Sequence, residues 1–127
     1  MNIGDVAKRA DLPTKTVRYY ADIGLVEPAA RADSGYRRYD EAALAKLIFI
    51  RRARAFGFSV PDCRELLSLY EDRHRSSADV KDIATRKLRE IEAKQRELQT
   101  LHDELAHLVH CCRGDDRPDC PILDYLS

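Results

Sequence analysis

The chain has 127 residues, of which 35% are charged and 7% are aromatic, with no tryptophan. This length suits one domain or two small sub-domains. No run of about 18 apolar residues occurs, so no membrane-spanning helix is expected. The amino-terminal segment lacks the apolar stretch of a secretory signal, so we expect a cytoplasmic protein with no membrane partner.

The formal net charge is zero, from 22 basic and 22 acidic residues, but the two signs are unevenly distributed. Residues 1–54 carry 11 Lys and Arg against 7 Asp and Glu, whereas residues 76–127 carry 8 basic and 11 acidic residues. A modest basic excess therefore lies at the amino-terminal end, where a nucleic-acid surface could lie.

Residues 1–75, the first of three parts, show the pattern of several short helices. Asn2 is placed to cap a first helix, and Lys15 to Ile23 predicts a second helix that ends before Gly24. Two short helices joined by about three residues are typical of a helix-turn-helix motif. The stretch from Leu25 to Tyr39, with its proline and glycine, predicts a short hairpin or wing.

Two further helices are expected after the wing. Asp40 is placed to cap the first, which ends at Gly57. Ser59 and Asp62 form a capping-box-like start to the second, which runs to about Tyr70.

Residues 76–110, the second part, hold one long helix from about Ala78 to His110, without glycine or proline. Its apolar residues recur with heptad spacing, and the expected dimerisation residues are Ile91, Leu98, Leu101, Leu105 and Leu108. At 1.5 Å per residue the helix is roughly 50 Å long, and no other predicted helix matches it. We therefore expect it to pair with a second copy of the chain, with packing against the first part as the alternative.

Residues 111–127, the third part, hold a polar turn between Cys112 and Cys120 and a short helix from Pro121 to Leu126. Thiolates are soft ligands that select Cu(I), zinc or iron–sulfur clusters. Two thiolates that flank a seven-residue loop can close on one ion in a linear arrangement. We expect only one of the adjacent residues Cys111 and Cys112 to bind.

Zinc and iron–sulfur clusters need more ligands than the pair Cys112 and Cys120 provides. Zinc prefers four, and the further candidates are Cys111, His110 and His107. An iron–sulfur cluster needs about four thiolates at closer spacing. Cys63 lies far from the loop in sequence and is expected to be a small buried hydrophobic residue.

Several ordered motifs together resemble the MerR family of metal-responsive transcription regulators. They are MNIGDVA at 1–7, TVRYY at 16–20, GLV at 24–26, SGYRRY at 34–39 and GFS at 57–59. The resemblance covers nearly the whole chain. Within the family, Cys112-x7-Cys120-Pro121-Ile122 and the stretch Ser77 to Lys81 resemble the copper efflux regulators.

The resemblance implies a mainly α-helical fold: a winged helix-turn-helix DNA-binding domain, a long antiparallel coiled-coil dimerisation helix and a carboxy-terminal metal-binding loop. It implies a homodimer that binds double-stranded promoter DNA with and without metal. Bound metal would distort the promoter so that RNA polymerase transcribes efflux or detoxification genes. No Ser/His/Asp, paired-carboxylate or phosphate-loop constellation occurs, so we expect no enzyme.

The candidate DNA contacts fall on the second helix and the wing. A helix in a major groove needs cations for phosphates and guanine edges, and the second helix offers Lys15, Thr16, Arg18, Tyr19 and Tyr20. The alternative is a solvated face, and in either case Val17 and one tyrosine are expected in the core. The resemblance adds Arg31, Tyr36, Arg37 and Arg54 as contacts to DNA. Arg38 could simply be solvated. For Arg51 and Arg52, a contact with DNA and exposure to solvent or pairing within the chain stay equally open.

The resemblance selects Cys112 and Cys120 as the metal ligands and leaves Cys111 as a bystander or a secondary thiol. Family members that sense divalent ions carry a thiolate where this chain has Ser77. Serine adds no charge, which favours a +1 effector: Cu(I), Ag(I) or Au(I). Ser77 or Ser76 could also simply cap the long helix. The alternatives are a regulator of the same fold that senses a divalent metal or oxidation, and a thiol-based metal-buffering protein.

Overall fold

The computed structural model describes residues 1–31 and 35–127 of the chain. Its contacts form two compact units, Met1–Ala84 and Thr85–Ser127, which divide inside the long helix. The division by function into residues 1–75, 76–110 and 111–127 stays a prediction. Residues 32–34, which include Ser34 of the SGYRRY motif and part of the predicted wing, lie outside the described residues.

The first two helices form the predicted helix-turn-helix motif. α1 spans Ile3–Ala10 and α2 spans Thr14–Asp22, each starting within one residue of its expected position. Asn2 Oδ1 accepts a hydrogen bond from the Asp5 amide at 2.8 Å and so caps α1. Gly24 follows α2 with a φ of 70°, the left-handed conformation that commonly ends a helix.

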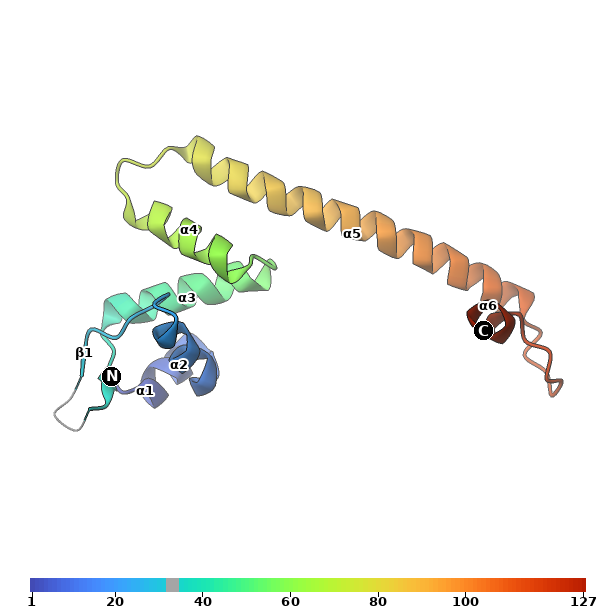
Figure 1. Ribbon diagram of the computed structural model, residues 1–127, viewed down its shortest axis with the longest axis horizontal. Helices are drawn as coiled ribbons and strands as arrows, with labels where there is room; N and C mark the ends of the chain where they lie inside the picture. The colour runs from blue at the N-terminus through green and yellow to red at the C-terminus, as the bar shows by residue number, and fades with distance from the viewer. Residues whose placement is uncertain (32–34) are drawn as a thin grey trace. The chain divides into compact units, whose positions relative to one another are not determined.

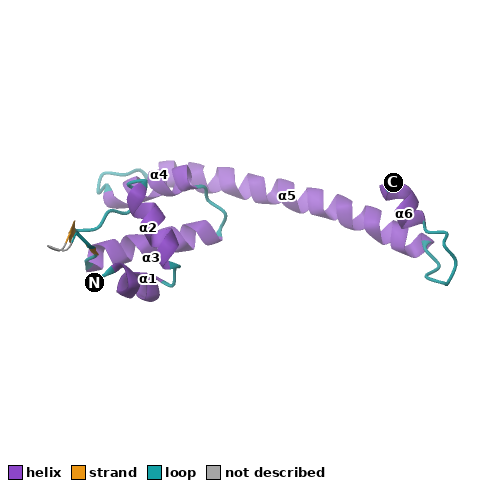
Figure 2. Ribbon diagram, turned by 60° about the horizontal axis from the view of Figure 1, so that its bottom comes forward, coloured by secondary structure: helices purple, strands orange, loops and turns teal. Residues whose placement is uncertain are grey.

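A two-stranded antiparallel sheet forms the predicted wing, drawn in orange in Figure 2. β1 spans Ala30–Arg31 and β2 spans Arg37–Arg38, with Arg31 opposite Arg37. The Tyr39 amide donates a hydrogen bond to the Met1 carbonyl at 2.7 Å, next to the end of β2. The base of the wing is therefore joined to the start of α1.

Both helices expected after the wing are present. α3 spans Glu41–Ala55 and α4 spans Val60–Glu71. The Asp40 carboxylate accepts a hydrogen bond from a first-turn amide of α3 at 2.8 Å. Ser59 and Asp62 form the reciprocal capping box at the start of α4, as the sequence predicts.

The helices α1 to α4 pack around one apolar core (Figure 1). Its fully buried large side chains are Tyr39, Leu47, Ile50, Val6, Val17, Val26 and Cys63. The expected burial of Cys63 is thus confirmed, and this burial raises the pKa of its thiol.

The long helix α5 spans Ser77–Cys111, one residue longer at each end than expected. The Ser76 hydroxyl accepts a hydrogen bond from the Ala78 amide at 3.1 Å. Of the two serines that could cap the helix, Ser76 therefore does so, and Ser77 is the first helical residue. Ile83 is buried, and no residue from 85 to 127, all of them described, is buried.

The last helix, α6, spans Pro121–Leu126 and lies beside the end of α5 (Figures 1 and 2). The Tyr125 hydroxyl lies 3.4 Å from the Glu104 carboxylate, which links the two helices. Within residues 1–31 and 35–127, none of the helices is both long and apolar enough to span a membrane.

Replacing the capping serine of α4, Ser59→Ala, is expected to lower the free energy of unfolding by about 1 kcal/mol, because the amide of Asp62 loses its acceptor. Urea unfolding at a fixed protein concentration measures the change. The matched control is Ser68→Ala, an exposed position inside α4, which should be neutral or slightly stabilising because alanine favours helix. Equal destabilisation by both variants would contradict this account of the cap.

Candidate functional site

The second helix presents a basic face to solvent. Lys15 and Arg18 are exposed, Tyr19 is 52% exposed and Thr16 is half-buried. Val17 and Tyr20, three residues apart, face the core instead. This confirms that valine and one tyrosine of α2 belong to the core.

Tyr20, which was named among the expected DNA contacts, is the tyrosine that is buried. Its side chain is 5% exposed and packs in the apolar cluster of the first unit. The neighbouring Tyr19 points away from the core because one residue is a rotation of about 100° on a helix. Tyr20 therefore packs α2 against the core, while Tyr19 is exposed on the surface of α2.

Arg37 of the wing is bound to α2. Its Nη2 lies 2.5 Å from the Asp22 carboxylate, and its Nη1 donates to the Arg18 carbonyl at 3.4 Å. The hydrogen bond to Asp22 raises the pKa of Arg37, and the side chain of Arg37 is only 22% exposed. Part of the hydrogen-bonding capacity of Arg37 therefore joins the wing to α2, and its expected contact with DNA stays a prediction. Arg38, beside it, is exposed.

A hollow of about 270 Å³ lies between α1, α2 and the wing. It is lined by Ile3, Arg18, Gly35, Tyr36 and Arg37. Tyr36 is 74% exposed. Arg18 of α2 thus lies around the same hollow as Tyr36 and Arg37 of the wing, although the two segments are separate in the sequence. Arg31 lies in β1, opposite Arg37.

The three arginines near the end of α3, Arg51, Arg52 and Arg54, differ in their exposure to solvent. Arg54 is exposed and donates from Nη1 to the Phe58 carbonyl at 2.7 Å, which ties it to the following turn. Arg52 is exposed. The Nε of Arg51 is buried and has no hydrogen-bond partner in the part of the chain that the structure describes. Arg54 and Arg52 are thus the members of this cluster whose side chains face solvent.

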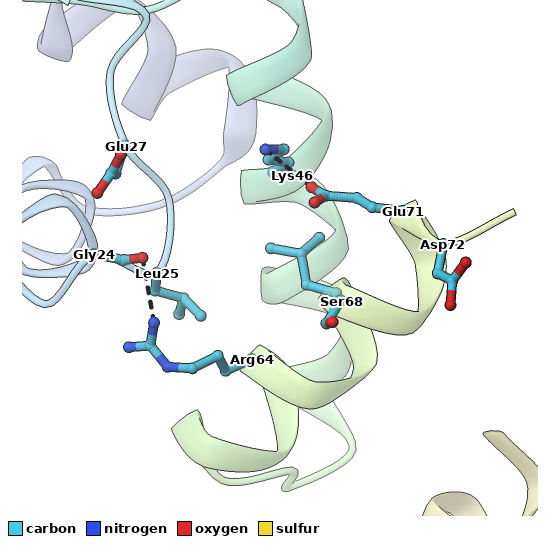
Figure 3. A pocket seen from close by; sticks show the side chains of 9 residues that line it. Gly24, Leu25, Glu27, Lys46, Arg64, Ser68, Glu71 and Asp72 are labelled. Atoms are coloured by element: carbon cyan, nitrogen blue, oxygen red, sulfur yellow. Dashed lines mark hydrogen bonds and ion pairs between the residues drawn. The ribbon is translucent and has the colours of Figure 1, made fainter. Parts of the chain in front are cut away.

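Sequence reasoning missed Arg64, which holds the carboxy-terminal end of α2 (Figure 3). Its Nη2 donates to the Ile23 carbonyl at 2.9 Å and its Nη1 to the Gly24 carbonyl at 3.2 Å. A cation at a helix carboxy-terminus satisfies carbonyls that have no partner within the helix. Nearby, Lys46 and Glu71 join α3 to α4 at 2.9 Å. The orientation of α2 is therefore coupled to α4.

The heptad seam of α5 has no partner within its own unit. Leu98, Leu101 and Leu105 are more than half exposed, Ile91 is 36% exposed and Leu108 is half-buried. Soluble proteins rarely leave so regular a row of leucines exposed to water. The seam is therefore a candidate surface for a second helix.

Two thiols flank the carboxy-terminal loop. Cys112 directly follows α5, and its amide continues the helical pattern by donating to the Leu108 carbonyl at 3.1 Å. Cys120 occupies the N-cap position of α6. Both are free and half-buried, whereas Cys111 is free and exposed.

The donor set of this loop fits a two-coordinate ion. Within residues 1–31 and 35–127, no three His, Cys, Asp or Glu side chains gather where they could hold a metal. Two soft sulfurs suit an ion that accepts linear coordination. Ser77 is exposed as the first residue of α5, and Cys112 directly follows the last residue of that 35-residue helix.

Comparison with known proteins identifies the family. A family model described as MerR HTH family regulatory protein matches residues 1–69, and one described as MerR, DNA binding matches residues 44–108. The chain is 58% identical over 127 residues to the HTH-type transcriptional regulator HmrR of Rhizobium leguminosarum bv. viciae, covering 100% of this chain and 98% of the relative. It is 46% identical to the HTH-type transcriptional regulator CueR of Salmonella typhimurium, covering 100% and 92%.

A solved structure agrees with these relatives along the whole chain. The transcription regulator PbrR691 from Ralstonia metallidurans CH34, in complex with lead(II), superimposes with a TM-score of 0.85 at 34% identity, covering 100% of this chain and 99% of that one. The relatives are regulators and not enzymes. With its capped helix-turn-helix motif, its wing and these full-length matches, the chain belongs to the MerR family of helix-turn-helix transcriptional regulators.

Proposed function

We propose that this regulator is a metal-responsive activator of copper efflux or detoxification genes. It binds double-stranded promoter DNA as a homodimer and responds to a +1 ion, Cu(I), Ag(I) or Au(I), held by Cys112 and Cys120. The observation that carries the proposal is the pair of half-buried free thiols at the two ends of one loop, without a third ligand among the described residues. The similarity to proteins named HmrR and CueR supports it.

The DNA surface is formed by α2 and the wing together. The exposed face of α2 carries Lys15 and Arg18, which suit guanine edges and phosphates in a major groove. Thr16 and Tyr19 flank these two residues on α2. Tyr36, Arg31 and Arg54 are proposed to contact the sugar–phosphate backbone of the DNA. Because Arg37 is held by Asp22 at 2.5 Å, the wing keeps a defined position relative to α2. A defined position fixes the register of the protein on the duplex.

The dimer is proposed to form through the exposed seam of α5. Burying leucines that are 54–66% exposed removes apolar surface from water, at roughly 25 cal/mol per Å². An antiparallel pair brings the first residue of one α5 near the last residue of the other. In that arrangement Ser77 of one copy lies near the loop of its partner, although the two lie at opposite ends of a 35-residue helix in one chain. This is how a residue so far from the thiols can influence the choice of metal.

The metal response requires that the ion favours one state of the dimer. Cys112 and Cys120 would hold the ion, each through its own thiolate, and so link the two ends of the loop of residues 113–119. Cys112 extends the backbone pattern of α5, and Cys120 begins α6. Drawing these thiolates together constrains α6 against the end of α5. An ion that binds one dimer state more tightly shifts the population toward it. We propose that this state distorts the promoter so that RNA polymerase can start transcription.

The DNA surface is tested by comparing two arginines. Arg18→Ala is expected to weaken binding to the specific promoter by about 1–3 kcal/mol more than binding to random DNA, because a base contact is lost. Arg37→Ala should weaken both alike, because it frees the wing. Fluorescence anisotropy at several salt concentrations measures both affinities. Arg73→Ala, an exposed arginine outside this surface, is the control. Identical behaviour of the Arg18 and Arg37 variants would refute the division between base reading and positioning.

The dimer interface is tested by placing a charge in the seam. Leu98→Glu should give monomers in sedimentation velocity and lose specific promoter binding, because a carboxylate cannot be buried against leucines without a partner. Thr100→Glu adds the same charge to an exposed position on another side of α5 and should leave the dimer intact. A dimeric Leu98→Glu protein would show that the interface lies elsewhere.

The metal site is tested by three cysteine or serine changes. Cys112→Ser and Cys120→Ser should abolish activation by Cu(I) and Ag(I) while promoter binding persists. Ser77→Cys adds a third sulfur and should give a weaker, new response to Zn²⁺ or Hg²⁺. Transcription from the cognate promoter in metal-buffered medium measures the response, with the buried Cys63→Ala as a control cysteine. An unaltered Cu(I) response of Cys112→Ser, or an equal Zn²⁺ response of the native protein, would reject the two-thiolate assignment.

A further inference from the structure

A second pair of metal-binding side chains lies on the last turn of α5, outside the loop. His107 Nε2 is 3.7 Å from Cys111 Sγ, and both residues are exposed. They are four residues apart, so they share one face of the helix. The proposed Cu(I) site uses neither of them. A borderline nitrogen donor and a soft sulfur donor therefore face solvent side by side, without a role in the function proposed above.

The separation of the two donor atoms indicates the geometry of an ion between them. Bonds of about 2.3 Å to sulfur and 2.0–2.1 Å to nitrogen place atoms 3.7 Å apart at an angle of about 115–119° at the metal. This angle lies between the tetrahedral and the trigonal-planar values, and it is far from linear. A linear ion with the same bond lengths would need the two atoms about 4.3–4.4 Å apart. The pair is thus already spaced for a bent arrangement, which a tetrahedral ion can accept, and not for linear coordination.

We propose that His107 and Cys111 form a separate site for a tetrahedral divalent ion, of which Zn²⁺ is the commonest. Cys111 binds as the thiolate and releases its proton to the solvent, while His107 binds through Nε2. Two water molecules fill the remaining positions, because no third His, Cys, Asp or Glu in the described part of the chain joins a metal-binding group. With only two protein ligands, the site exchanges its ion readily.

The location of the pair keeps it accessible in a dimer. On an ideal helix, His107 and Cys111 lie about 100° or more around the axis from the centre of the seam formed by Leu98, Leu101 and Leu105. Pairing of two seams therefore does not cover them. An ion at this site would fasten the last turn of α5 directly before Cys112. The chain would then carry two sites with different coordination numbers at neighbouring positions.

Cobalt(II) is a spectroscopic probe for this site, because a tetrahedral thiolate complex absorbs through sulfur-to-cobalt charge transfer and intense visible bands. The full-length Cys112→Ser/Cys120→Ser protein, which lacks the loop thiols, is titrated with CoCl₂ under reducing conditions. We expect one tetrahedral cobalt per chain, displaced by Zn²⁺. Adding Cys111→Ser should remove the charge-transfer band. Adding His107→Ala should weaken binding at least tenfold.

The control is His102→Ala, an exposed histidine of the same helix whose Nδ1 lies 3.1 Å from Asp103 and which should leave the spectrum unchanged. Circular dichroism of each variant verifies that α5 is intact, as expected for exposed positions. Absence of a tetrahedral spectrum in the double serine variant would overturn the proposal. A charge-transfer band that survives Cys111→Ser, or cobalt affinity that is the same in His107→Ala, would overturn it as well.

Discussion

The apolar core of the described residues is built by α1 to α4 and the segments between them. Among the residues that the structure describes, Ile83 is the last buried one, and residues 85–127 supply none. A helix of 35 residues with a row of exposed leucines cannot be stabilised by its own chain in the way that α1 to α4 are. The proposed dimer would cover this apolar surface with the same helix of a second molecule.

The same core determines which residues of the first unit face outward. Val17 and Tyr20 anchor α2, so Lys15, Arg18 and Tyr19 are left on its solvent side. Two arginines from elsewhere then fix this helix in space: Arg37 through Asp22, and Arg64 through the carbonyls of Ile23 and Gly24. The helix that carries the basic surface is thus hydrogen-bonded to both the wing and α4.

The two metal sites proposed at the carboxy-terminal end of α5 differ in their donor atoms and in the coordination number that they favour. Cys112 and Cys120 offer two sulfurs across a loop, which suits a +1 ion with low coordination number. His107 and Cys111 offer mixed donors 3.7 Å apart on a rigid helical face, which suits tetrahedral geometry. In these two proposals the adjacent cysteines 111 and 112 serve different sites, because consecutive residues at the end of a helix point in different directions.

Local patterns in the sequence determined the secondary structure of this protein. The caps by Asn2 and Asp40, the box of Ser59 and Asp62, and the uninterrupted run that forms α5 involve residues three or four apart, so their physics is visible without a fold. Motif order likewise identified the family. The tertiary structure decided which of two adjacent tyrosines is buried and gave Arg37 and Arg64 their partners. Those partners lie 15 to 41 residues away, and only the packed core brings such distant groups within hydrogen-bonding distance.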